Sequence, residues 1–367
     1  MNLSEFRNKT VLITGHTGFK GSWLTCWLLK LGAKVIGISD CIPTSPSLFE
    51  SLKLETKIDH ILGDIRDDNL ITNIILRHKP DFVFHLAAQA IVSKSYIESL
   101  ETISINVMGT ASVLEAIKNI EHECSIVIIT SDKCYENVEW EWGYKETDNL
   151  GGKDIYSGSK GAAEIIFHAY FNSFLRNKEN IAIATGRAGN VIGGGDWAQD
   201  RIVVDCFESW ESGVPVQIRS PQATRPWQHV LEPLSGYLNL AMTLRSKSSV
   251  NGESFNFGPQ ADRTKTVVEL MTDLYQYWYK EIDGGPFIIA ENKPFHEASL
   301  LKLNCDKALY HLNWKASLSY DQCVQFVGEW YADYFRGGDM YEATMTQIAG
   351  YEAEKISVEL DRIRVKT

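Results

Sequence analysis

Short apolar runs alternate with helix-like stretches through the first half of the chain. Between the first two runs, apolar residues recur at helical spacing over residues 23–31. The runs themselves are typical of strands buried on both faces of a parallel sheet, and they cover residues 11–13, 34–39, 60–62, 81–86 and 125–130. This alternation predicts an α/β fold with a doubly wound parallel sheet and right-handed crossovers.

The first apolar run ends in a glycine-rich turn, with the sequence VLITGHTGFKG over residues 11–21. Gly15 can adopt turn dihedrals closed to other residues, Gly18 lets the backbone approach a pyrophosphate, and Gly21 lets the helix pack on the strand. The N-terminus of that helix offers free N–H groups and a positive dipole end to phosphates. An ordinary strand-to-helix turn is the alternative. Strand, turn and helix in one unit favour a dinucleotide-binding Rossmann domain.

The second half of the chain has a different pattern. Glycine-rich and aromatic segments replace the alternation, and short strand candidates remain at residues 216–218 and 255–257. The charged stretch at residues 341–364 predicts a closing helix that faces solvent or another subunit.

This change of pattern predicts two interwoven domains. Residues 1–185 are expected to form the Rossmann domain, and a later segment near residues 225–257 is expected to return to it. Residues 186–367 are expected to form mainly a smaller C-terminal domain that binds the substrate.

Composition narrows the classes of partner. The 367-residue chain has a formal net charge of −11, which argues against nonspecific nucleic-acid binding and favours a small-molecule partner. Its seven cysteines include no Cys-x-x-Cys pair, so neither a disulfide framework nor a metal site is expected. The chain has no signal-like N-terminus and no apolar run of membrane-spanning length, so we expect a cytoplasmic protein without membrane contact.

The residues after the second apolar run bear on whether the cofactor is NAD or NADP. Asp40 follows this run, where an acidic side chain can accept hydrogen bonds from an adenosine ribose. A turn-forming Asp before Pro43 is the other interpretation. No arginine follows closely to bind a 2′-phosphate, so NAD is favoured over NADP.

Tyr156 and Lys160 form a Tyr-x-x-x-Lys pair, one helical turn apart on the same face. The lysine ammonium, helped by a positive nicotinamide ring, is expected to lower the pKa of the tyrosine towards neutrality. Tyr156 could then take a proton from a substrate hydroxyl while hydride passes to NAD. A surface pair is the alternative, but the glycine turn and Ser131, which follows the fifth apolar run, favour catalysis.

These motifs, together with Asn-Val-Met-Gly-Thr at residues 106–110, resemble the extended, nucleotide-sugar-modifying branch of the short-chain dehydrogenase/reductase superfamily. In that branch Asp64 would contact the adenine; a helix N-cap is the alternative. The resemblance implies NAD contacts at Gly15, Thr17, Gly18, Phe19, Gly21, Asp40, Asp64, Ile65, Ala87, Ala88, Gln89, Asn106, Tyr156 and Lys160.

The residues after Ser131 narrow the resemblance. Asp132 is followed by Lys133, where the dTDP-glucose 4,6-dehydratases have Asp and Glu. With GRAGNVIGGGDW at residues 186–197 and RPWQHVLEPL at residues 225–234, the chain resembles the CDP-glucose 4,6-dehydratase family over nearly its whole length. The resemblance implies a catalytic set made of Ser131, Asp132, Lys133, Tyr156 and Lys160.

The reaction implied by this family is redox-neutral overall. Tyr156 deprotonates the glucose 4-hydroxyl, NAD takes the C4 hydride, Asp132 protonates the departing C6 hydroxyl, and the hydride returns to C6, which gives CDP-4-keto-6-deoxyglucose. Lys133 could take the C5 proton if it is neutral, or stabilise an enolate if it is charged. A 4-epimerase, a 4,6-dehydratase for another nucleotide sugar, and a noncatalytic NAD-binding regulator are the alternatives.

The resemblance also implies a substrate site and an assembly. Arginine suits a diphosphate because its planar fork bonds bidentately. Relatives pair through two long helices, which implies a homodimer or homotetramer. The implied contacts to the nucleotide sugar are Gln89, Ser131, Arg187, Asn190, Arg201, Arg219, Arg225 and His229.

Overall fold

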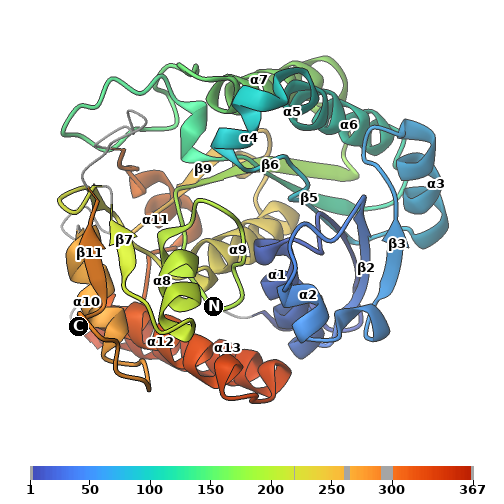
Figure 1. The fold of residues 1–367 in the computed structure, drawn as a ribbon. Helices are drawn as coiled ribbons and strands as arrows, with labels where there is room; N and C mark the ends of the chain where they lie inside the picture. Colours follow the sequence, from blue (N-terminus) through green and yellow to red (C-terminus); the bar gives the residue numbers. More distant parts are fainter. Residues whose placement is uncertain (1–2, 219, 260–264, 291–300, 365–367) are drawn as a thin grey trace.

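The computed structural model describes residues 3–218, 220–259, 265–290 and 301–364. Its centre is a seven-stranded sheet in the order β3-β2-β1-β4-β5-β6-β9, and every pairing in it is parallel (Figure 1). The predicted doubly wound parallel sheet is therefore confirmed. Its strands are β1 (Thr10–Thr14), β2 (Lys34–Ser39), β3 (Asp59–Leu62), β4 (Phe82–His85), β5 (Cys124–Ile129), β6 (Ile181–Ala188) and β9 (Ser254–Phe257).

Successive residues of a strand point to opposite faces of the sheet, and each face has its own apolar core. Val11 and Ile13 of β1 join one core, while Leu12 between them joins the other. The first core is covered by α1 (Phe19–Lys30) and α9 (Leu231–Ser246). The opposite core is covered by α3 (Asp68–His78), α6 (Thr110–Lys118) and α7 (Ile155–Tyr170).

The second half of the chain contributes to both parts of the fold. The strand candidate at 216–218 is confirmed as β7, which pairs with β11 (Phe287–Ile289) outside the main sheet. The candidate at 255–257 is confirmed as β9, at the edge of the main sheet. The two domain boundaries drawn from the sequence stay a prediction.

The remaining elements are short strands and peripheral helices, several of which lie around the lower half of the molecule in Figure 1. A second small sheet pairs β8 (Thr224–Arg225) with β10 (Lys265–Thr266). The other helices are α2 (Leu48–Ser51), α4 (Val92–Ile97), α5 (Ser99–Ile103), α8 (Ile202–Glu211), α10 (Val267–Tyr275), α11 (Asp306–Leu312), α12 (Tyr320–Phe335) and α13 (Met340–Arg364).

The closing helix α13 is packed more firmly than its charged sequence predicts. Ile348 and Tyr351 are fully buried, and the Tyr351 hydroxyl donates to a Glu232 carboxylate oxygen at 2.7 Å. The Trp27 indole of α1 donates to Glu352 at 2.8 Å. One face of this helix therefore belongs to the core beside α1 and α9, and is not only a solvated or subunit-facing surface.

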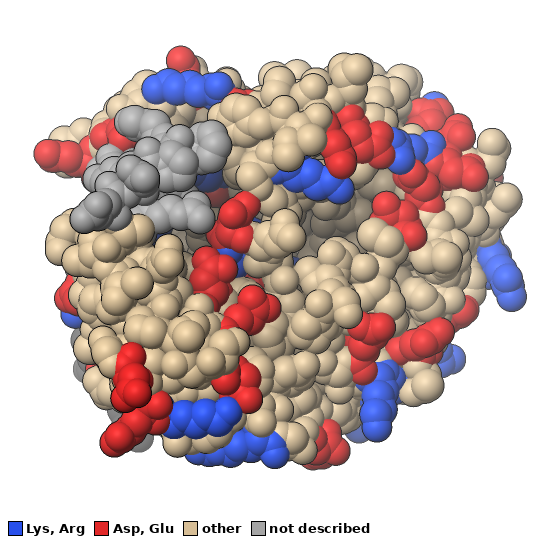
Figure 2. Space-filling model, in the orientation of Figure 1, with Lys and Arg blue, Asp and Glu red and all other residues tan. Residues whose placement is uncertain are grey.

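Three global properties bear on function. Among the described residues, no helix has the length and apolar content needed to cross a bilayer, and no group of three or more His, Cys, Asp or Glu side chains is placed to hold a metal ion. On the face seen in Figure 2, acidic and basic side chains are interspersed, without one continuous basic area.

Candidate active site

The glycine turn after β1 has the geometry that a dinucleotide needs. Gly15 has φ +77°, and a Cβ there would lie 2.7 Å from the Ala87 Cα atom. A Cβ on Gly21 would lie 2.1 Å from the Gly15 carbonyl oxygen, so α1 could not approach the turn. Gly18, which precedes α1, has nothing of the protein closer than 3.4 Å to such a Cβ. Its missing side chain therefore leaves space free at the helix N-terminus, as close approach of a phosphate requires.

The predicted adenosine contacts lie at the carboxyl ends of β2 and β3. The Thr17 hydroxyl donates to the Cys41 carbonyl at 2.7 Å, which joins the glycine turn to the segment after β2. Asp40 lies in that segment and is exposed. Asp64 is held by Arg66 at 2.6 Å, and this hydrogen bond lowers the pKa of the Asp64 carboxyl. The contacts of Asp40 and Asp64 with a nucleotide stay predictions.

The segment after β4 is held by Asn106. The Asn106 side chain accepts from the Gln89 N–H at 2.8 Å and donates to the Gln89 carbonyl at 3.1 Å and to Ser159 of α7 at 2.9 Å. The Gln89 amide group in turn bonds to Thr102 and to the Ile91 backbone. These side chains are therefore engaged inside the protein, and the position they fix is that of the Ala87–Gln89 backbone.

The predicted catalytic residues come from two elements that pack against each other. Ser131 follows β5 and caps the short 3-10 helix η4 (Asp132–Cys134). Its hydroxyl accepts from the Lys133 N–H at 3.2 Å and donates to Asp132 at 3.0 Å. The serine therefore orients the carboxylate beside it.

Tyr156 and Lys160 lie in the first turns of α7, which packs against the 3-10 helix η4. Asp154 caps α7 by accepting the Ser157 N–H at 2.9 Å, which places Tyr156 in the first turn. The Tyr156 and Lys160 side chains are buried, and the Lys160 ammonium lies 6.0 Å from the centre of the Tyr156 ring. Gly161 lets α7 approach η4, because a Cβ there would lie 3.2 Å from the Cys134 carbonyl oxygen.

Burial dominates the electrostatics of this site. It raises the pKa of the Asp132 carboxyl, against the opposing effects of Lys133 and of the Ser131 hydrogen bond. It also lowers the pKa of Lys160 to about 8. Burial raises the pKa of Tyr156 to about 12, although a hydrogen bond with Ser131 opposes the rise. The expected lowering of the tyrosine pKa is therefore not produced by the residues of this chain alone.

One cation of the site was missed by the sequence analysis. Lys20 lies in the first turn of α1, and burial lowers the pKa of its ammonium to about 8. Asp132 is the carboxylate that most strongly opposes this shift, and Lys20 in turn lowers the pKa of Lys160. The only feature of the sequence that could have indicated Lys20 as a site residue is its position between Phe19 and Gly21 of the glycine-rich turn.

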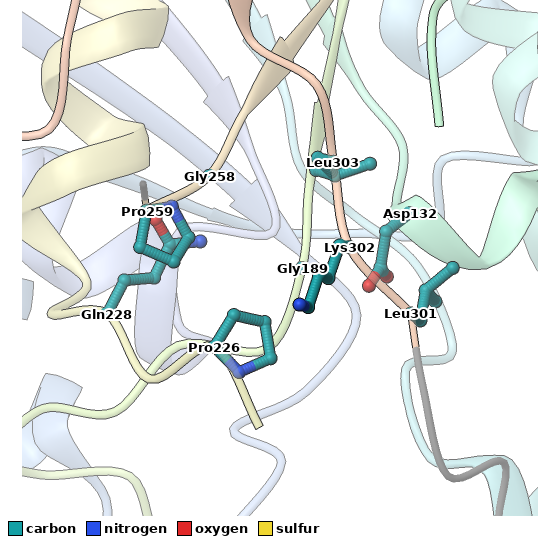
Figure 3. A pocket seen from close by; sticks show the side chains of 9 residues that line it. All are labelled: Asp132, Gly189, Pro226, Gln228, Gly258, Pro259, Leu301, Lys302 and Leu303. Carbon is teal, nitrogen blue, oxygen red and sulfur yellow. The ribbon is translucent and has the colours of Figure 1, made fainter. Parts of the chain in front are cut away.

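A small cavity opens beside Asp132 (Figure 3). Gly189 lines it, and a Cβ there would lie 3.0 Å from an Asp132 carboxylate oxygen. Pro226, Gln228 and Lys302 also line it. Gly189 and Pro226 are the immediate sequence neighbours of Asn190 and Arg225, two of the predicted substrate residues, and the position of those two side chains at a substrate stays a prediction. Gln228 and Lys302 were not predicted.

The structure contradicts Arg187 as a substrate contact. Its side chain is 1% exposed, and its Nε and Nη2 atoms each donate to Glu164 at 2.9 Å. The remaining donor group bonds to the Tyr135 hydroxyl at 2.8 Å. Because Arg187 lies within β6, its side chain faces the sheet surface under α7 rather than the end of the strand.

His229 does not line this cavity either. Its ring is fully buried and packs edge-on against Trp23 and Phe326, with ring centres 5.5 Å apart in both cases. This apolar environment lowers the pKa of the imidazole to about 3. The residue before it, Gln228, is the one that lines the cavity.

The other predicted substrate residues lie nearer the site. Asn190 is exposed just beyond β6, and Arg225 lies partly buried in β8. Arg201 precedes α8, where it forms an ion pair with Asp196 at 4.0 Å, and it lowers the pKa of Tyr156. Arg219 lies outside the described residues.

A family model described as GDP-mannose 4,6 dehydratase matches residues 12–327. The CDP-glucose 4,6-dehydratase of Salmonella typhimurium is 44% identical over 350 residues, which cover 94% of this chain and 97% of the relative. The resemblance inferred from the motifs is therefore confirmed. A dTDP-glucose 4,6-dehydratase of Xanthomonas campestris is 24% identical over 338 residues, covering 88% of this chain and 93% of the relative.

Solved structures agree with the fold. A dTDP-glucose 4,6-dehydratase from Bacillus anthracis, in complex with NAD, matches with a TM-score of 0.72 at 20% identity, over 91% of this chain and 99% of that one. An epimerase from Methanothermobacter thermautotrophicus matches with a TM-score of 0.76 at 21% identity, over 91% of this chain and 96% of that one. Both dehydratases and epimerases therefore share this architecture.

Proposed function

Since this chain belongs to the GDP-mannose 4,6-dehydratase family, we propose that it is an NAD-dependent hydro-lyase that converts CDP-glucose to CDP-4-keto-6-deoxyglucose. The observation that carries this proposal is the buried Ser131–Asp132 hydrogen bond, beside Tyr156, in a chain 44% identical to a CDP-glucose 4,6-dehydratase. A carboxyl whose pKa is raised by burial can hold its proton until a leaving hydroxyl needs it.

The glycine turn fits NAD. The N–H groups at the start of α1 would bind the cofactor diphosphate in the space left free by Gly18, and Asp40 would accept hydrogen bonds from the adenosine ribose. Asp64, Ile65 and the Ala87–Gln89 backbone would form the adjoining walls. When bound, NAD supplies the hydride acceptor for C4, the hydride donor for C6 and a positively charged ring.

Each catalytic side chain has a separate task in this reaction. Tyr156 takes the proton of the glucose 4-hydroxyl, to which Ser131 also bonds, and Lys160 stabilises the resulting phenolate. The C4 ketone makes the C5 proton acidic, and Asp132 then protonates the departing C6 hydroxyl. Lys133 either takes the C5 proton as a neutral amine or stabilises the enolate as a cation. Both tasks fit its place directly after Asp132.

The nucleotide sugar would extend from this site to the cavity rim. Asn190 and Arg225 would bind its diphosphate, and the Arg201 guanidinium would contribute positive charge nearby. Arg201 already acts on Tyr156 and Lys20 in the protein, which supports its place beside the substrate. Gln89 would contribute chiefly through its backbone, because its amide group is bonded to Thr102.

We further propose that the protein is a cytoplasmic homodimer or homotetramer. Apolar side chains are exposed on α5, on the π-helical turn Ser104–Gly109 that follows it, and on α7. They include Leu100 at 81%, Met108 at 57% and Ile165 at 57% exposure. Covering these helices with a second copy would remove that apolar area from water. Light scattering on the wild type and on Leu100→Asp tests this assembly, and a monomeric wild type would contradict it.

The substrate is tested by incubating the protein with CDP-, dTDP-, UDP- and GDP-glucose in deuterated water. We expect CDP-glucose to lose one water and to acquire solvent deuterium at C5, as read by mass spectrometry and NMR. An isomer of unchanged mass would indicate a 4-epimerase, and dehydration of another nucleotide sugar would reassign the base. No product from any of them would contradict the proposal.

A further inference from the structure

The cavity beside Asp132 contains two polar groups that the proposed reaction leaves without a task. In Figure 3 Asp132 projects into it from one side, Gln228 lies with Pro226 and Pro259 on the other, and Lys302 lies between them. Segments far apart in the sequence supply these walls. A cavity with convergent polar groups of different chemistry is typical of a ligand site.

Gln228 brings into the cavity wall a hydrogen-bond acceptor without a partner in the described part of the chain. Its side chain is 3% exposed, and its amide nitrogen donates to the Phe257 carbonyl at 3.4 Å. The Gln228 Oε1 atom is buried and has no partner among the described residues. A buried acceptor of this kind is costly unless a donor reaches it. A sugar hydroxyl can donate, whereas a phosphate at neutral pH only accepts.

Lys302 offers the opposite chemistry. No carboxylate in the described ranges forms an ion pair with the Lys302 ammonium. Lys302 lines the cavity together with Gly189 and Pro226, the sequence neighbours of Asn190 and Arg225. Lys133 and Lys20, rather than Lys302, are the cations that act on the pKa of Asp132. Among the residues that the structure describes, the ammonium is thus not engaged by a carboxylate, and it can serve an anionic ligand.

The Lys302 backbone is fixed relative to the 3-10 helix η4, which carries Asp132. Its carbonyl accepts the Tyr144 N–H at 2.9 Å, and the Asn304 N–H donates to the Tyr144 carbonyl at 2.9 Å. Leu301 and Leu303, on either side, pack on the small core of Cys134, Tyr135 and Tyr144. Because Cys134 ends the same 3-10 helix that Asp132 begins, the two walls of the cavity form one packed unit.

We propose that Lys302 binds the diphosphate of the nucleotide sugar and that Gln228 accepts a hydrogen bond from a hydroxyl of its hexose. The two residues would hold the sugar with C6 towards Asp132. This inference rests on the proposed function for the class of ligand. It assigns two positioning residues that determine how the substrate lies, and neither is a catalytic residue.

The test is calorimetric binding of CDP and of CDP-glucose to NAD-loaded wild type and variants. For Lys302→Met we expect weaker binding of both ligands, by about tenfold or more, because both carry the diphosphate. For Gln228→Leu we expect CDP-glucose to bind about three- to tenfold more weakly and CDP to bind as in the wild type, because CDP lacks the hexose. Lys302→Arg should restore most of the lost affinity.

The control is Lys34→Met, which removes an exposed cation at the amino end of β2 and should change neither affinity. Unchanged CDP binding by Lys302→Met, or an equal loss of both ligands in Gln228→Leu, would overturn the assignment. Circular dichroism checks that each variant is folded. If Lys302→Met is not folded, Lys302→Gln takes its place. If the wild type dehydrates a different nucleotide sugar, that sugar and its nucleoside diphosphate replace CDP-glucose and CDP in the binding test. An error in the proposed substrate is thereby distinguished from an error in the assignment of Lys302 and Gln228.

Discussion

Arg187 of β6 and Glu164 of α7 form a doubly hydrogen-bonded ion pair inside the protein, with both N···O distances at 2.9 Å. Glu164 lies one helical turn beyond Lys160, and it also bonds to Thr130 at the end of β5. The pair therefore joins β6 to the helix that carries Tyr156 and Lys160, and the Thr130 hydrogen bond joins that helix to the strand that leads to Ser131. Burial alone would raise the pKa of Glu164, but Arg187 and the surrounding hydrogen bonds lower it.

Breaking this pair is expected to cost stability rather than substrate affinity. Arg187→Met would leave a buried carboxylate without its partner, which destabilises proteins by about 3–5 kcal/mol. The urea midpoint should therefore fall, while the double variant Glu164→Gln/Arg187→Met should be less destabilised than Arg187→Met. If Arg187→Met kept its midpoint and lost affinity for CDP-glucose, Arg187 would be a substrate contact after all.

Lys160 is expected to show a trade-off between stability and activity that depends on pH. Its pKa is about 8 in the folded protein and about 10.4 when unfolded, so its buried charge destabilises the fold fully below pH 8. Between these two values the unfolded chain holds more protons, and wild-type stability from this group rises with pH.

Lys160→Met in the NAD-free protein should therefore be more stable than wild type at pH 7, by up to about 3 kcal/mol, and inactive. The difference in urea midpoint should shrink as the pH approaches 10. Lys34→Met, which removes an exposed lysine, should show no such pH-dependent gap. A gap that widens with pH would contradict the burial of this ammonium.

The sequence predicts this fold well because apolar runs and glycines act locally. The run at residues 11–13, the turn at Gly15 and the pair Tyr156 and Lys160 each specify a strand, a turn or a helix face within a few residues. Ser131 could be placed for the same reason, since it directly follows a strand whose carboxyl end borders the site.

The errors and omissions in the site have one physical origin. Whether a side chain faces the ligand depends on packing between elements that are distant in sequence. Arg187 and His229 lie within matching motifs, yet α7 and the core around Trp23 cover them. Lys302 lies outside every motif and reaches the cavity only because its segment bridges to Tyr144.

The glycines of the cofactor turn are expected to separate stability from binding. Gly21→Ala should destabilise the fold by about 1–3 kcal/mol, because the new Cβ would lie 2.1 Å from the Gly15 carbonyl oxygen. Gly18→Ala should stay within about 1 kcal/mol of wild type, since its Cβ meets no protein atom closer than 3.4 Å. Its NAD affinity should nevertheless fall by about tenfold or more, as measured by calorimetry. Unchanged NAD affinity in Gly18→Ala would place the cofactor diphosphate elsewhere.

Asp132→Asn should separate elimination from oxidation. The amide oxygen can still accept the Ser131 hydroxyl, so the local structure is preserved, but the proton for the C6 hydroxyl is lost. Dehydration should slow by about 100-fold or more. Tyr156 and Lys160 are unchanged, so oxidation at C4 should continue and the absorbance of reduced cofactor should build up. Wild-type turnover by this variant would remove Asp132 from the mechanism.

Lys133 can be assigned by comparing two substitutions. Lys133→Ala should leave NAD affinity unchanged and collapse dehydration, because both the amine and its charge are lost. Lys133→Arg keeps the charge, but a guanidinium does not give up its proton near neutral pH and cannot act as a base. Arginine should therefore retain much of the activity if Lys133 stabilises the enolate, and almost none if it removes the C5 proton. Exchange of solvent deuterium into C5 separates these outcomes directly, and full turnover by the alanine variant would show that neither task belongs to Lys133.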